Sequence, residues 1–335
     1  MKKMKVCIVG AGAIGGFIGA RLAATGACQV SAVARGATLA ALQAHGWRLQ
    51  QGASLLQLPA AVSASPAELG VQDLVIIAVK GPALAAVAQA IAPLLGRDSI
   101  VLPAMNGVPW WFGAGIAALG QAPLASVDPG GRIAAAIAQD RVLGCVVHAS
   151  CTSPEPGLVR HKMGRGIIIG EPDGGASARV ARVGDLFTRG GFDVTLSPHV
   201  RADIWYKLWG NLTMNPVSAL TGASMDRLLD DALVREFCSA AMREAAAVGA
   251  RIGCAVAQSP EERHAVTRQL GPFKSSMLQD VEAGRAIELD SIVAAVREMG
   301  QRVGVATPHI DALLGLTRLF ARVHGLYPEE PRPAA

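Results

Sequence analysis

Aromatic and charged residues are both scarce in this chain. Phe, Trp and Tyr make up 4% of its 335 residues and Asp, Glu, Lys and Arg 17%, whereas hydrophobic residues make up 51%. This balance excludes a disordered or collagen-like chain. Ala, Val, Leu, Ile and 38 Gly dominate the rest, which favours helices packed closely on a sheet over an aromatic-rich sandwich. The length suits two domains.

Paired cysteines, blocks of like charge and long apolar runs are also missing. None of the six Cys residues has a partner at CxxC spacing, which predicts reduced thiols, no metal site and a cytoplasmic protein. The net charge of +5 is spread along the chain, which argues against nucleic-acid and membrane partners and suits a small anionic ligand. Apolar runs such as residues 74–79 are far too short to span a membrane.

Short apolar runs alternate with helical stretches in the first half of the chain. They predict buried parallel strands, because they lack polar alternation and helices separate them; the runs lie at 5–9, 29–34, 74–79 and 99–103. Residues 142–170 carry turn-forming Pro and Gly and predict a mixed or antiparallel extension of this sheet, with 192–197 as its last strand.

From residue 202 onward the strand signals stop, and long Ala- and Leu-rich segments follow. We therefore expect an α/β Rossmann-type domain over residues 1–198 and an all-α domain over 199–327. The last residues, 328–335, are Pro-rich and are expected to form a flexible tail.

A glycine-rich turn, Gly10-Ala11-Gly12-Ala13-Ile14-Gly15, follows the first predicted strand and opens a helix. In a dinucleotide-binding turn the first glycine permits a tight bend, the second admits a pyrophosphate, and the third lets the helix pack on the strand. The N–H groups around Ala13 and Ile14 would then face the phosphates. A purely structural turn is the alternative, but the position at the start of a βαβ unit favours a dinucleotide site.

The end of the second predicted strand carries no acidic residue, although NAD sites usually have one there; the first acidic residue of the chain is Glu68. Arg35 stands in that place, and a guanidinium can pair bidentately with a 2′-phosphate. Arg35 therefore favours NADPH, unless it is an ordinary surface arginine. Lys80 and Asn106 follow the third and fourth strands, where open α/β sheets bind ligands, although each could be a loop residue only.

A polar stripe marks the first long helical segment. Lys207, Asn211 and Asn215 are spaced i, i+4 and i+8 among Trp, Leu and Met. Unpaired buried polar groups cost about 1–3 kcal/mol each, so these side chains need a ligand, a protein partner or solvent. On the pattern alone a structural use is favoured, and Glu288 likewise fits the cap region of the next helix.

Together these strings resemble the ketopantoate reductase (2-dehydropantoate 2-reductase) family. The similarity extends from the glycine-rich turn to residues 304–308 and is most specific at AMNG (104–107), KLWGNLTMN (207–215) and SSMLQDVEAGRAIELD (275–290). It implies a Rossmann domain that binds NADPH, a helical domain of the 6-phosphogluconate-dehydrogenase type, and an oxidoreductase that reduces a 2-oxo acid to a 2-hydroxy acid.

The resemblance also implies roles for individual residues. Lys207 matches the general acid that protonates the developing alkoxide, and Glu288 matches the glutamate that engages the substrate hydroxyl. The polar residues that match positions around the substrate and the nicotinamide are Asn106, Asn211, Asn215 and Ser276. Arg35 and Lys80 match cofactor-side residues.

The chain departs from the family pattern at Trp110 and Trp111, which predict either helix packing or a reshaped pocket mouth, and at residues 145–152.

The default substrate is ketopantoate, which would place the chain in pantothenate and coenzyme A biosynthesis. The alternative is a related NADP-dependent reductase of another oxo or hydroxy acid. A non-catalytic NADP-binding sensor would be expected to lack Lys207 and Glu288. A homodimer, the natural direction and the strictness for NADPH are left open.

Overall fold

The computed structural model describes residues 3–329 and divides into two compact units. The first unit runs to Phe112 and takes in Gly130–Asp203; the second contains Gly113–Pro129 and the chain from Ile204 onward. The sequence analysis placed a single boundary at 198/199 and assigned residues 113–129 to the first domain. The structure differs, because it groups this segment with the helices of the second unit.

Two charged side chains hold the segment Gly113–Pro129 in the second unit. The Glu298 carboxylate accepts hydrogen bonds from the backbone N–H groups of Ala125 and Ser126, both at 2.9 Å, and from the Ser126 hydroxyl at 2.6 Å. Arg302 donates to the carbonyl oxygens of Ala122 and Pro123, each at 2.6 Å. The segment thus satisfies its backbone with partners that lie far along the sequence.

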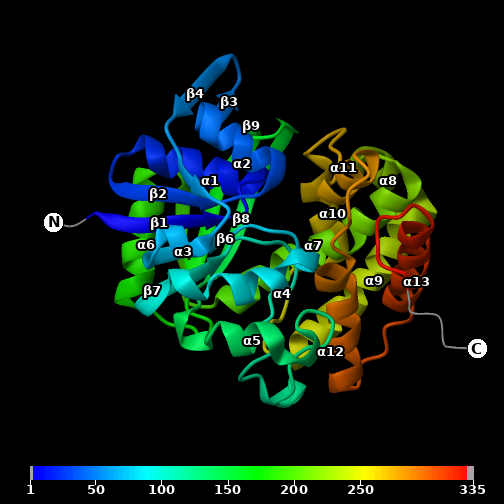
Figure 1. Cartoon of the computed structure of the whole chain (residues 1–335). Helices are drawn as coiled ribbons and strands as arrows, with labels where there is room; N and C mark the ends of the chain where they lie inside the picture. Colours follow the sequence, from blue (N-terminus) through cyan, green and yellow to red (C-terminus); the bar gives the residue numbers. More distant parts are fainter. Residues whose placement is uncertain (1–2, 330–335) are drawn as a thin grey trace, which may run out of the picture. The chain divides into compact units, whose positions relative to one another are not determined.

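The glycine-rich turn lies on a parallel five-stranded sheet with the strand order β5-β2-β1-β6-β7 (Figure 1). Its strands are β1 (Met4–Val9), β2 (Cys28–Val33), β5 (Ala61–Ser63), β6 (Gln72–Ile77) and β7 (Leu95–Pro103). The helices that alternate with them are α1 (Ala13–Ala24), α2 (Gly36–His45), α3 (Pro66–Leu69) and α4 (Gly81–Ala90), and α5 (Arg132–Ala136) follows. The four predicted apolar runs are confirmed as β1, β2, β6 and β7, with ends shifted by a few residues.

The mixed strands form a second sheet instead of the predicted extension. Its order is β10-β9-β3-β4, with β8 paired to β9. These strands are β3 (Trp47–Gln51), β4 (Ser54–Leu58), β8 (Gly144–Glu155), β9 (Leu158–Gly170) and β10 (Asp193–Ser197). The β3–β4 and β8–β9 pairs are antiparallel, whereas β3 and β10 run parallel to β9. The mixed character was predicted correctly; the β3–β4 hairpin was not anticipated.

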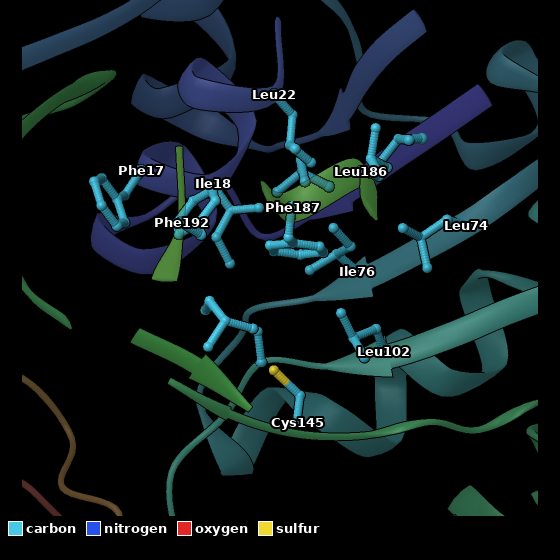
Figure 2. Close-up of a cluster of buried hydrophobic side chains, with 14 of the residues drawn as sticks. Phe17, Ile18, Leu22, Leu74, Ile76, Leu102, Cys145, Leu186, Phe187 and Phe192 are labelled. Carbon is cyan, nitrogen blue, oxygen red and sulfur yellow. The ribbon is translucent and has the colours of Figure 1, made fainter. Parts of the chain in front are cut away.

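Helix α1 packs against strands of both sheets and holds the glycine-rich turn at its N-terminus. Phe17, Ile18 and Leu22 of α1 are fully buried in the main core, where Figure 2 shows them near β6 and β7 side chains and near Phe187 of α6 (Ala178–Arg189). A Cβ on Gly19 would lie 2.5 Å from the Trp47 ring, so only glycine lets β3 approach α1 this closely. The core therefore fixes the helix whose first turn would receive a phosphate.

A bidentate ion pair joins the end of β9 to α6. Arg179 Nε donates to Glu171 Oε1 at 2.8 Å, its Nη2 pairs with Oε2, and the Ser177 hydroxyl also donates to Oε1. The two charged side chains are 29% and 15% exposed. The hydrogen bonds from Arg179 hold the pKa of Glu171 below its ordinary value of 4.5.

Glu171→Gln is therefore expected to lower the free energy of unfolding by about 1 kcal/mol near neutral pH. Because the folded-state pKa of Glu171 is depressed, its contribution is present above the unfolded-state value and is lost as the pH falls through the folded-state value. The difference in Tm between the natural chain and the variant should shrink as the pH falls below about 4.5. Glu236→Gln, which alters an exposed pair with Arg243, is the matched control and should change Tm little. A Tm difference that stays constant down to acidic pH would contradict the assignment.

The second unit is helical. Its helices are α7 (Val200–Thr221, whose first turn belongs to the first unit), α8 (Met225–Asp230), α9 (Ala232–Arg251), α10 (Pro260–Arg268), α11 (Ser276–Glu282), α12 (Ala295–Val303) and α13 (Pro308–Val323). Two of the Ala- and Leu-rich segments expected after residue 202, those over 225–252 and 259–285, are each divided into two helices. Asp231 causes the first break, since its side chain caps α9 by accepting from the N–H groups of Leu233 and Val234.

A π-helical turn, Asp290–Ala294, leads into α12. Within residues 3–329, no helix is long and apolar enough to cross a bilayer. Of the predicted tail, Pro328 is described and its carbonyl accepts a hydrogen bond from Arg322 Nε at 3.1 Å. Residues 330–335 lie outside the described part of the chain.

Candidate active site

The three glycines of the turn occupy the positions that a dinucleotide requires. Gly10 has a φ of +93°, and a Cβ there would lie 2.6 Å from Val79 Cγ1. A Cβ on Gly15 would lie 2.0 Å from the carbonyl oxygen of Gly10, so α1 can start this close to β1 only with glycine. At Gly12 a Cβ would meet nothing within 4 Å, and the residue is exposed. The backbone is thus open at the position where a pyrophosphate would approach.

A pocket of about 260 Å³ opens beside this turn within the first unit. Gly10 and Gly12 of the turn line it, together with Arg35 and Thr38. Its remaining walls are mostly apolar and come from the ends of β1 and β2 and from α4; they include Val9, Val33, Val87, Ala90 and Ile91. Apolar walls with a cation at the edge suit the adenosine end of a nucleotide, so the residues present fit the cofactor.

Arg35 gives this pocket its positive charge. It is exposed, lies directly before α2 and occupies the N-cap position of that helix. Glu68, the first acidic residue, is engaged elsewhere: its carboxylate accepts a hydrogen bond from the Ser63 hydroxyl at 2.6 Å. Thr38, one turn into α2, was not identified from the sequence. The only feature of the sequence that could have indicated Thr38 as a pocket residue is its position three residues after Arg35.

Lys80 and Asn106 lie beyond the carboxyl ends of adjacent strands, as predicted for loops of an open sheet. Lys80 is the N-cap residue of α4 after β6, and Asn106 follows β7; both are half-buried. The backbone N–H of Ala78 donates to Val9 and that of Ala104 to Ile77, at 2.9 and 2.8 Å, which carries the pairing of the strands just past their ends. Both side chains therefore start from the sheet edge where ligands of this fold bind.

The polar stripe predicted from the sequence lies on α7. Lys207 and Asn211 are half-buried and Asn215 is buried. The rest of the helix is anchored in the second unit: Trp205, Trp209 and Leu212 are buried, and Trp209 Nε1 donates to the Met242 carbonyl at 2.7 Å. A helix held on its apolar side presents the ammonium of Lys207 from a fixed backbone.

Hydroxyl groups tie α11 to the same stretch of α7. The Ser218 hydroxyl donates to the carbonyl of Asn215 at 2.8 Å and lies 2.5 Å from the hydroxyl of Ser275. Ser275 is buried and caps α11, since its Oγ accepts from the N–H of Leu278. Ser276, the exposed first residue of α11, is thereby placed next to the Asn215 turn of α7.

Glu288 lies at the entry to the last part of the second unit. It is half-buried and directly precedes Leu289, the first helical residue before the π-helical turn. Its neighbours Ile287 and Leu289 are buried. This position agrees with the cap-region interpretation and places Glu288 at a helix start.

The tryptophan pair is buried, which favours packing over a pocket mouth. Trp110 and Trp111 are 4% and 2% exposed and lie in a turn. The Arg201 guanidinium lies 5.8 Å from the centre of the Trp111 ring, and a Cβ on Gly144 would lie 3.1 Å from that ring. The unusual residues 145–152 belong to β8, where Cys145 joins the main core.

A Rossmann unit with a nucleotide pocket, followed by a helical unit that carries a lysine and two amides on one helix, defines a two-domain, dinucleotide-binding oxidoreductase. Comparison with known families narrows this class. The family ketopantoate reductase PanE/ApbA matches residues 6–174, and its C-terminal domain matches residues 199–321. The chain belongs to the ketopantoate reductase family.

Individual relatives align with nearly the whole chain. A 2-dehydropantoate 2-reductase from Mesorhizobium japonicum is 41% identical and aligns with 97% of this chain and all of its own length. The crystal structure of a candidate ketopantoate reductase from Ralstonia solanacearum is 55% identical, with a TM-score of 0.93 over 97% of this chain and all of that one. The PanE/ApbA family ketopantoate reductase from Ralstonia eutropha is 26% identical, with a TM-score of 0.82 over 96% of this chain and all of that one.

Proposed function

We propose that this chain is an NADPH-dependent reductase that converts 2-dehydropantoate to pantoate in the cytoplasm, within pantothenate and coenzyme A biosynthesis. The observation that carries this proposal is the full-length relative named 2-dehydropantoate 2-reductase, at 41% identity. The pocket beside Gly10 and Arg35 supports it from the cofactor side. A homodimer stays a prediction.

The bound cofactor would supply a hydride to the C2 carbonyl of the oxo acid. The open backbone at Gly12 would receive its pyrophosphate and Arg35 its 2′-phosphate. Lys80 and Asn106 would contact the cofactor nearer its nicotinamide end. Each of these groups binds or orients, and none of them changes its own bonding.

Lys207 would act as the general acid. Its ammonium stabilises the negative charge that develops on the carbonyl oxygen and then donates a proton to it. Because the side chain is only half-buried, solvent can return the proton after each turnover. Asn211, Asn215 and Ser276 would bind the substrate around its carboxylate, and Glu288 would accept a hydrogen bond from its hydroxyl.

A screen of 2-oxo acids with purified protein tests this proposal, with NADPH oxidation followed by its absorbance. We expect kcat/KM for 2-dehydropantoate to exceed that for 3,3-dimethyl-2-oxobutanoate, which differs only in lacking the hydroxyl, by at least about tenfold. Equal turnover of the two acids would assign the chain to a reductase of a different oxo acid. No turnover of any acid, with NADPH still bound, would identify a sensor instead of an enzyme.

A further inference from the structure

The chain after α13 folds back onto the segment that carries Glu288. The backbone N–H of Ile287 donates to the carbonyl of Leu326 at 3.1 Å, and the N–H of Leu326 donates to Ala321 of α13 at 2.7 Å. The side chains of Ile287 and Leu326 are both buried. This places the end of the described chain directly beside Glu288 on its N-terminal side.

Tyr327 holds the same segment on its other side. Its hydroxyl donates to Asp290 Oδ1 at 2.5 Å, two residues after Glu288. The Arg322 guanidinium lies 5.7 Å from the centre of the Tyr327 ring, which fixes the ring against α13. Desolvation, together with the neighbouring Asp290, raises the pKa of the Tyr327 phenol, so Tyr327 remains the donor at neutral pH.

Two anchors therefore hold the chain on either side of Glu288. The first is the backbone hydrogen bond between Ile287 and Leu326, and the second is the side-chain hydrogen bond between Asp290 and Tyr327. The second anchor reaches the first residue of the π-helical turn, Asp290–Ala294. Such turns are rare and frequently occur at functional sites. Tyr327 lies beyond residues 199–321, the part of the chain that the C-terminal family domain matches.

We propose that Tyr327 is a positioning residue: its bond to Asp290 orients the Glu288 carboxylate toward the hydroxyl of the substrate and so supports the preference for a hydroxylated 2-oxo acid. This inference rests on the proposed function, because it assigns a purpose to the Glu288 carboxylate. It predicts an effect on substrate choice, which a purely structural bond would not have.

The test compares 2-dehydropantoate with 3,3-dimethyl-2-oxobutanoate in a set of variants, with kcat and KM measured for each acid. Tyr327→Phe removes the hydroxyl and keeps the ring under Arg322. Asp290→Leu removes the acceptor from the other side, and Asp290→Asn keeps an acceptor oxygen. Glu288→Leu removes both acceptor oxygens and serves as the reference for lost hydroxyl recognition. Asp311→Asn, at an exposed ion pair with Arg297, is the control in the same unit.

We expect Tyr327→Phe and Asp290→Leu to lower kcat/KM for 2-dehydropantoate by about tenfold or more, and to change that for 3,3-dimethyl-2-oxobutanoate less than about threefold. Asp290→Asn should retain most of the preference, and Asp311→Asn all of it. Tyr327→Phe added to Glu288→Leu should lower the preference no further, because both changes act on one interaction.

Each contrary result is informative. If Tyr327→Phe slows both acids equally, or leaves the preference unchanged while Glu288→Leu abolishes it, the positioning role is wrong and the proposed function stands. If the natural chain shows no preference for 2-dehydropantoate, the proposed function and this inference fall together. Thermal unfolding monitors folding; if both Tyr327→Phe and Asp290→Leu fail to fold, the bond serves stability and the inference is overturned.

Discussion

Lys207→Ala is expected to lower kcat for the reduction of 2-dehydropantoate by about 10²–10⁴-fold, the range typical for loss of a general acid. Without the ammonium, the alkoxide that forms on hydride transfer loses its proposed proton donor and the positive charge of Lys207. NADPH binding should change little, because the nucleotide pocket belongs to the first unit and Lys207 to the second. Stopped-flow measurement of NADPH oxidation with saturating substrate, together with a fluorescence titration of NADPH, separates the two effects.

Two further variants sharpen this experiment. Lys162→Ala removes an exposed lysine of β9 and should leave kcat unchanged. Lys207→Arg keeps the positive charge but replaces the ammonium with a guanidinium that does not readily give up a proton, so it should restore substrate affinity more than rate. A loss of less than about tenfold in Lys207→Ala would show that another group donates the proton.

Arg35→Asp is expected to weaken NADPH binding by about 10²-fold and to leave NADH binding nearly unchanged. The arginine lines the nucleotide pocket, and a bidentate, charge-assisted pair with the 2′-phosphate would be replaced by repulsion between two anions. Titration of the two cofactors gives both dissociation constants, and the ratio between them is the quantity that the substitution should change.

Arg251→Asp makes the same charge change at an exposed position at the end of α9, and it controls for the overall electrostatic field. It should weaken NADPH binding only slightly. Equal losses for NADPH and NADH in Arg35→Asp would mean that Arg35 contacts a part of the nucleotide that both cofactors share, and the preference for NADPH would then need another source.

The parts of the fold that the sequence analysis predicted correctly are those that depend on residues close together in the chain. The four central strands are continuous apolar runs, and part of the need for glycine in the turn is local: Gly10 has a positive φ, and a Cβ on Gly15 would lie against the carbonyl oxygen of Gly10. The stripe from Lys207 to Asn215 follows from helical periodicity alone. Such features depend on near neighbours in the chain, so they can be recognised in a single sequence.

The features that escaped prediction depend on contacts between distant residues. β3 joins a second sheet only because it pairs with β9, more than 100 residues away, and its own five residues include three polar side chains. Thr38 became a pocket residue only once the pocket was seen. The bond between Tyr327 and Asp290 joins a segment expected to lead into a flexible tail to the helix start at Glu288, and no periodicity indicates it.

The division of the chain has a consequence for its synthesis. The path passes from one unit to the other at three points, after Phe112, Pro129 and Asp203. While the ribosome is still adding the middle of the protein, residues 113–129 have already emerged, but Glu298 and Arg302, whose side chains hold this segment, do not yet exist. Residues 113–129 therefore remain without these partners, with their backbone groups hydrogen-bonded to water, until about nine-tenths of the polypeptide has been made.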